Sequence, residues 1–379
     1  MLMQVLSYYD DHGWSEPIDS SLDSSDTLVF AFGASRFGAS PLPLHQLRHA
    51  LPQSRLLGCS TAGEIHGTKV CDDSLVAAVL RFEHSQVRTA EATVHDASDS
   101  YRAGKELGHT LLDRELRAVV LLSDGLHVNG SELVRGINAV IGDRAIITGG
   151  LAADGSDFRK TWVMHNAEPQ SGIVAAVGLY GDRVRVGHGS KGGWDIFGPE
   201  RIVTRSAGNI LYELDGKPAL QLYKEYLGER AIGLPATALL FPLAVRATRD
   251  ADKKLVRTVL AVDELQQSMT FAGDIPQGAF AQLMRANFDR LVQGASEAAS
   301  MTLRGSDALG SRLSIAISCV GRRLVLGERI EEETEAAFDA LTGDVRQIGF
   351  YSYGEISPYA GGTCDLHNQT MTLTTLGEA

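Results

Sequence analysis

The sequence has few cysteines, no basic run and no long apolar segment. Its four cysteines form no CxxC pair and are too few for a disulfide framework, so reduced thiols are expected. The longest apolar stretches, at residues 173–180 and 234–245, fall short of the roughly 20 residues that span a bilayer. With 35 Lys and Arg against 47 Asp and Glu, the net charge is −12, which excludes nucleic acid and anionic membranes as expected partners.

The N-terminal segment also lacks the features of an export signal. Residues 1–26 are acidic and rich in serine, with no basic start followed by an apolar stretch. We therefore expect a cytoplasmic protein.

What the sequence does contain is typical of a folded globular protein. The 379 residues allow two or three domains, and 44% are hydrophobic and 22% charged, close to the globular average.

Apolar runs alternate with helical periodicity, which predicts a mixed α/β fold. Strands are expected at 27–33, 55–59, 118–122, 144–148 and 173–179, and again at 313–319 and 347–353. Helices are expected at 99–116, 278–293 and 328–341. Turn and helix-start signals at Asp215-Gly216 and Pro218 divide the chain into two β-rich halves with packed helices, with a boundary near residue 217.

One segment is repeated within the chain. The sequence RLLGCSTAGEI at 55–65 matches RQIGFYSYGEI at 346–356 with a constant offset, and shares arginine, both glycines, glutamate and isoleucine. A duplicated strand and turn would place Glu64 and Glu355 in equivalent positions, facing one cleft between the halves. Chance similarity between short β segments is the alternative.

These two copies, with SDGL at 123–126, GGLAADG at 149–155, LDGKPAL at 214–220 and LHNQT at 366–370, resemble the FIST family. The resemblance implies a FIST N domain over residues 27–217 and a FIST C domain over 218–372, together a cytoplasmic sensory module for small ligands. Some stand-alone members of the family are described as haem-binding sensors of nitric oxide. The resemblance to them implies that this chain regulates a histidine kinase, or a diguanylate cyclase or phosphodiesterase. The oligomeric state, including a homo-oligomer, is left open.

If haem b is bound, histidine is the expected axial ligand, because CxxCH is absent and no cysteine precedes a proline. His188 is the first candidate for the metal ligand, since Val184, Val186 and His188 share one face of an expected strand. Gly189 and Gly193 would let a flat macrocycle approach, beside Trp194. A core histidine next to a glycine-rich turn is the alternative, and His367 is the second candidate.

A metabolite without haem is the other expectation. Glu64, Glu355 and Tyr351 could orient an amino acid or a similar small molecule, and the backbone at Gly149 and Gly150 could approach it. The alternative, which is more common for a Gly-Glu pair at the end of a strand, is that each carboxylate accepts local N–H bonds. No nucleophile elbow and no phosphate-binding loop is present, so an enzyme is not expected.

Overall fold

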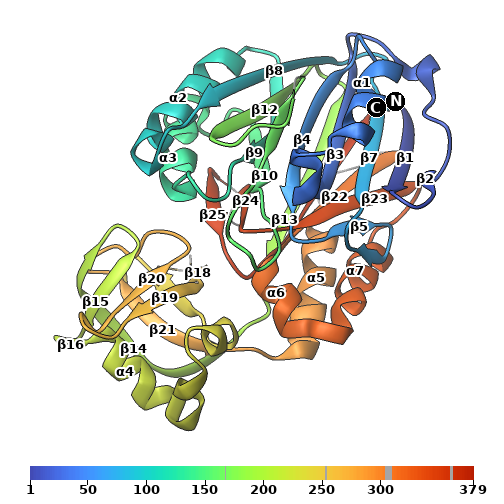
Figure 1. The fold of residues 1–379 in the computed structure, drawn as a ribbon. Helices are drawn as coiled ribbons and strands as arrows, with labels where there is room; N and C mark the ends of the chain where they lie inside the picture. The colour runs from blue at the N-terminus through green and yellow to red at the C-terminus, as the bar shows by residue number, and fades with distance from the viewer. Residues whose placement is uncertain (167, 252–253, 304–309, 359–361) are drawn as a thin grey trace.

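A computed structural model describes residues 1–166, 168–251, 254–303, 310–358 and 362–379. The expected mixed α/β fold with β-rich halves is confirmed: helices cover three six-stranded sheets, and a further sheet forms a separate lobe (Figure 1).

The three six-stranded sheets share one arrangement of strands. Each has two adjacent parallel strands, followed on one side by two antiparallel strands. In the first sheet these are β4 (Arg55–Thr61), β3 (Thr27–Ala34), β7 (Leu75–Arg81) and β1 (Leu2–Tyr9). In the second they are β10 (Ile146–Leu151), β9 (Leu116–Ser123), β12 (Ile173–Tyr180) and β8 (Gln86–Thr93). In the third they are β23 (Val345–Ser352), β22 (Arg312–Cys319), β26 (Met371–Glu378) and β13 (Val184–Lys191).

After its inner strand, the chain of each sheet continues into a short strand that pairs with another sheet, and the three exchanges form a closed cycle. After β4 the chain forms β5 (Glu64–His66) on β23, after β23 it forms β24 (Gly354–Pro358) on β10, and after β10 it forms β11 (Val163–His165) on β4. Three backbone hydrogen bonds close the cycle at the carboxyl ends of the inner strands: Ala62 N to Tyr351 O at 2.8 Å, Tyr353 N to Leu151 O at 3.2 Å and Ala153 N to Ser60 O at 2.9 Å. The core is therefore a pseudo-threefold assembly. Short edge strands complete the sheets: β2 (Gly13–Trp14), β6 (Lys69–Cys71) and β25 (Cys364–His367).

A glycine recurs at one position of the inner strands. A Cβ atom on Gly58, Gly149 or Gly349 would lie 2.4 Å or less from a carbonyl oxygen of the neighbouring parallel strand. Only glycine fits such a contact. The duplicated segment found in the sequence contains two of these positions, and Gly149 is the third.

The inner faces of the three sheets share one apolar core, in which the Phe32 and Phe350 rings lie 4.6 Å apart. Helices pack outside: α1 (Leu42–Ala50) on the first sheet, α2 (Ser100–Leu111) and α3 (Gly130–Ile141) on the second, and α5 (Phe288–Met301), α6 (Val320–Leu326) and α7 (Ile330–Asp339) on the third. The helix expected at 278–293 is partly wrong. Its first half is a strand that pairs with two neighbours, and the helix begins after Asn287, whose side chain accepts a hydrogen bond from Arg290 N.

Residues 195–285, here called the inserted unit, lie between β13 and α5 and form the lobe at the lower left of Figure 1. Its eight-stranded sheet has its own apolar core. Its elements are β14 (Asp195–Ala207), β15 (Ile210–Leu214), β16 (Lys217–Pro218), α4 (Ala219–Leu227), β17 (Leu243–Arg246), β18 (Leu255–Arg257), β19 (Val259–Asp263), β20 (Ser268–Phe271) and β21 (Phe280–Arg285).

Arg322 on α6 forms hydrogen bonds to both chain segments that connect the core to the inserted unit. It forms a fully buried ion pair with Glu333, with Nη2 2.6 Å from Oε2. The same guanidinium donates to Gly192 O, just before the inserted unit, and to Leu291 O, just after it. Because both charges are out of water, each depends on the other.

We predict that Arg322→Met lowers the free energy of unfolding by about 3–5 kcal/mol, because Glu333 keeps its burial and loses its partner. Arg329→Met is the matched control, since Arg329 pairs with Glu332 and Asp289 at the surface. Urea unfolding of both variants measures the difference. Equal losses would contradict a special role for the buried pair.

Candidate functional site

A cleft of about 720 Å³ lies between the core and the inserted unit. Its core side is built from the residues that follow β9, β10 and β22 and from Tyr353, which follows β23. The carboxyl ends of parallel strands are where α/β sheets commonly bind ligands. Its other side comes from the segment 233–239 and from β19, β20 and their neighbours.

Two stacked aromatic rings form part of the core side. Phe158 and Tyr353 lie 4.4 Å apart, centroid to centroid, at an interplanar angle of 7°. Asp154 holds both in place, because it accepts hydrogen bonds from the Tyr353 hydroxyl and, at 3.0 Å, from Phe158 N. Burial, followed by the Asp154 carboxylate, raises the pKa of Tyr353. The tyrosine therefore stays protonated and donates to Asp154.

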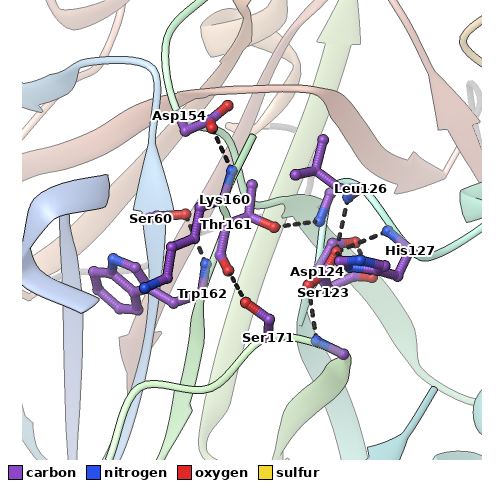
Figure 2. A network of polar contacts seen from close by, with 12 residues as sticks. Ser60, Ser123, Asp124, Leu126, His127, Asp154, Lys160, Thr161, Trp162 and Ser171 are labelled. Atoms are coloured by element: carbon purple, nitrogen blue, oxygen red, sulfur yellow. Dashed lines mark hydrogen bonds and ion pairs between the residues drawn. The ribbon is translucent and has the colours of Figure 1, made fainter. Parts of the chain in front are cut away.

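Asp124 shapes the loop that follows β9 (Figure 2). Its carboxylate accepts from the backbone N–H groups of Leu126 at 2.8 Å, His127 at 2.9 Å and Gly172 at 2.8 Å. Burial alone would raise the pKa of Asp124, but these N–H groups lower it. The fixed carboxylate thus holds Gly125 and Leu126 in the cleft wall.

Cys319 occupies the position in the third repeat that Asp124 has in the second. Cys319 N donates to Thr370 O, just as Asp124 N donates to Ile173 O. Cys319 lines the cleft, and burial raises the pKa of its thiol. At this position the third repeat therefore presents a neutral thiol.

Thr258 supplies a polar group on the inserted-unit side. The residue is 4% exposed, and its hydroxyl is buried without a hydrogen-bond partner. Leu260 and Phe271 flank it in the cleft wall. Among the described residues this hydroxyl therefore has an unsatisfied donor and acceptor next to the cleft.

None of the described residues that line the cleft has a charged side chain. Three lining residues, Phe158, Leu260 and Leu324, are large apolar side chains that are 44–51% exposed. Exposed apolar groups gathered in one hollow indicate a binding surface.

The two carboxylates expected from the repeat do occupy equivalent positions. Glu64 accepts from Thr61 and from Ser74 N and Oγ, and Glu355 accepts from Ser352 and from Thr370 N and Oγ. Both side chains are buried, and neither is among the cleft-lining residues. Their hydrogen bonds tie each turn to the residue just before an antiparallel strand, Ser74 before β7 and Thr370 before β26.

The other residues expected to bind a metabolite also lie outside the cleft lining. Tyr351 is fully buried in the core. Gly149 packs on Leu121 O, and Gly150 pairs with Glu355 across β10 and β24. These residues stand near the crossing of the sheets, one or two positions from the cleft-lining Leu151 and Tyr353.

The glycines and the tryptophan that were expected beside haem pack against other parts of the chain in this structure. His188 lies on β13, its pKa lowered by burial and its Nδ1 buried without a partner. However, Cβ atoms on Gly189 and Gly193 would lie 2.0 Å from Ala298 O and 2.1 Å from Arg290 O, so α5 fills the space assigned to a macrocycle. The Trp194 indole donates to Gln369 O at 2.7 Å, and the His367 ring bonds to Ser357 O at 2.9 Å. His188 as an axial ligand stays a prediction.

Sequence reasoning missed the main cleft residues. Tyr353 lies inside the duplicated segment, so its place beside a turn was available as a signal. No sequence motif marks Phe158 or Thr258. The place of Phe158 in the cleft depends on a left-handed backbone conformation (φ +52°), and that of Thr258 depends on the position of the inserted unit. Across the described residues, no helix is long and apolar enough to cross a membrane, and no group of three potential metal-ligating residues is found.

We predict that the two buried carboxyls destabilise the protein as pH rises from 5 to 8. Burial raises the pKa of Glu64 to about 7 and of Glu355 to about 8. The native state therefore keeps protons that the unfolded chain releases near pH 4.5. The resulting stabilisation is complete below that pH and is lost as pH rises through the raised values, by on the order of 3 kcal/mol for each group.

Urea unfolding from pH 5 to 8 tests this with Glu355→Gln, whose amide can accept from Thr370 N and donate to Ser352. The variant should lose less stability over this range than the unchanged protein. Glu331→Gln is the control, because its Lys69 partner lowers the pKa of Glu331 and it titrates below this range. Parallel curves for all three proteins would contradict the prediction.

Comparison with known proteins identifies the family. The FIST N domain matches residues 27–217, and the FIST C domain matches residues 219–358. An uncharacterized protein of Methanocaldococcus jannaschii is 24% identical over 315 residues, which cover 76% of this chain and 59% of that protein, so the chain spans little more than half of that relative. Among solved structures, a cyanuric acid hydrolase from A. caulinodans is 9% identical, with a TM-score of 0.35 over 100% of this chain and 99% of that one, too low to carry an argument. The chain belongs to the FIST family of sensory signal-transduction domains.

Proposed function

We propose that this chain is a sensory module that binds a small organic ligand in the cleft between the core and the inserted unit. The observation that carries the proposal is that the two walls of the cleft belong to different structural units. They come from two units with separate apolar cores, joined by two neighbouring segments of chain. A ligand that contacts both walls favours the arrangement in which they are closer together.

Helix α6 connects the cleft to the two joining segments. Val320, Gly321 and Leu324 line the cleft, and Arg322 between them holds Gly192 O and Leu291 O. A ligand that displaces α6 therefore acts on the segments that position the inserted unit. In this proposal the moved lobe is the signal that a partner protein detects.

The partner expected from the family resemblance is a histidine kinase or a cyclic-di-GMP enzyme. The proposal requires only that the partner contacts the core and the inserted unit together, or a surface that changes when they move. A sensory role for the family supports this arrangement.

Haem with nitric oxide sensing is not part of the proposal, because α5 occupies the space beside Gly189 and Gly193, where a macrocycle was expected to approach. A free amino acid is also disfavoured, because its two charges would meet no charged side chain among the described cleft residues.

Equilibrium dialysis against a deproteinised small-molecule extract, read by mass spectrometry, tests the proposal. Leu260→Trp fills the cleft from a side chain that is 44% exposed, and Leu265→Trp adds the same group at a position of the inserted unit that is 98% exposed and outside the cleft lining. We expect compounds that are retained by the unchanged protein and by Leu265→Trp but not by Leu260→Trp. Identical retention by all three proteins would contradict a ligand site in the cleft.

A haem titration followed by absorption spectroscopy tests the rival site. We expect no saturating Soret shift that depends on His188, and therefore equal spectra for the unchanged protein and His188→Ala. A stoichiometric band that the variant loses would overturn this expectation and restore His188 as the axial ligand.

A further inference from the structure

Resting on the proposed function, we infer that the cleft selects an uncharged, planar and largely apolar ligand with a polar atom at one edge. Three features of the described residues carry the inference: the absence of charge in the lining, the stacked aromatic pair, and one unpartnered hydroxyl.

The absence of charge decides the class of ligand. The chain as a whole carries 82 charged residues among 379, yet no Lys, Arg, Asp, Glu or His is found among the 28 residues that line the cleft. A charged ligand would lose water there without gaining a partner, and burial of an unpaired charge is strongly unfavourable. A neutral ligand avoids that cost and gains from the removal of apolar surface from water.

The carboxylates of Asp124, Asp154 and Asp274, each next to a lining residue, do not alter this conclusion, because each already accepts at least one hydrogen bond from the protein. Asp274, which follows Gly273, accepts from Asn129 Nδ2 at 3.2 Å. Asp124 accepts three backbone N–H bonds, and Asp154 accepts from the Tyr353 hydroxyl and from the N–H groups of Phe158, Arg159 and Lys160. Asp124 and Asp154 therefore hold the backbone of the cleft wall in place, and their oxygens are occupied by these hydrogen bonds.

The aromatic pair favours a flat molecule. Phe158 and Tyr353 are parallel within 7°, and Phe158 is 51% exposed, so its ring offers surface to a further flat group. Offset stacking contributes beyond the area buried. The positive φ of Phe158 and its N–H bond to Asp154 hold the ring in this position.

Thr258 and the aromatic pair lie on opposite sides of the cleft, which determines how the ligand is oriented. Its hydroxyl is buried and unpartnered on the inserted-unit side, whereas the aromatic pair belongs to the core. A ligand that stacks on one side and bonds to Thr258 on the other contacts both units. Selection of this ligand class and closure of the cleft therefore depend on the same contacts.

Two dyes with one ring system provide the test. Nile red is neutral and carries a carbonyl where Nile blue carries a cationic iminium. Fluorescence titrations of the unchanged protein, Leu260→Trp and Leu265→Trp identify the binding that depends on the cleft. We expect saturable Nile red binding that Leu260→Trp abolishes and Leu265→Trp retains. The dissociation constant for Nile red should be at least tenfold lower than that for Nile blue, although the net charge of −12 attracts the cationic dye. Thr258→Val should weaken Nile red binding about threefold to tenfold through loss of one hydrogen bond.

The outcomes separate the two claims. If Nile blue, or the anion anilinonaphthalenesulfonate, binds the Leu260-dependent site as tightly as Nile red, the cleft binds ligands and the inferred class is wrong. If no dye binds in a way that depends on Leu260, both the class and the proposed cleft site are contradicted. Unchanged binding to Thr258→Val would remove the hydroxyl from the inferred contacts.

Discussion

The exchange of short strands among three sheets is the constraint on which the rest of the molecule depends. Each inner strand ends at a backbone hydrogen bond to the next repeat, and the three bonds form a closed cycle. No sheet can shift its register alone, because its edge strand belongs to the chain of another sheet. The buried carboxyls of Glu64 and Glu355 reinforce two of the three crossings, and in the second repeat Asp124 ties the loop after β9 to Gly172.

This constraint also creates the site. The crossings bring the carboxyl ends of inner strands together, and the inserted unit leaves the core next to them through segments held by Arg322. The core side is rigid, because it is fixed by closed hydrogen bonding, while the inserted unit has its own apolar core. A rigid wall facing a separately folded lobe can convert ligand binding into a movement of that lobe.

The sequence predicted the parallel inner strands and the duplicated carboxylate turns, because both depend on local patterns: apolar runs, and a Gly-Glu pair after a strand. It did not predict β1, β7, β8 or β26. It also did not predict the repeat formed by the second sheet, because there the tying carboxylate, Asp124, follows β9 rather than β10. The cleft could not be predicted either. Tyr353, Phe158 and Thr258 are separated by about a hundred residues or more along the chain, and only the placement of the inserted unit brings them to one cavity.

The central claim is that a ligand in the cleft changes the position of the inserted unit relative to the core. Spin labels on Lys105→Cys in α2 and Leu265→Cys in the inserted unit, both exposed, measure that position directly once the partly exposed Cys71 is replaced by serine. The account predicts that saturating Nile red shifts and narrows the distance distribution between the labels, and that Leu260→Trp prevents this change. An unaltered distribution with the dye bound in the cleft would contradict the account.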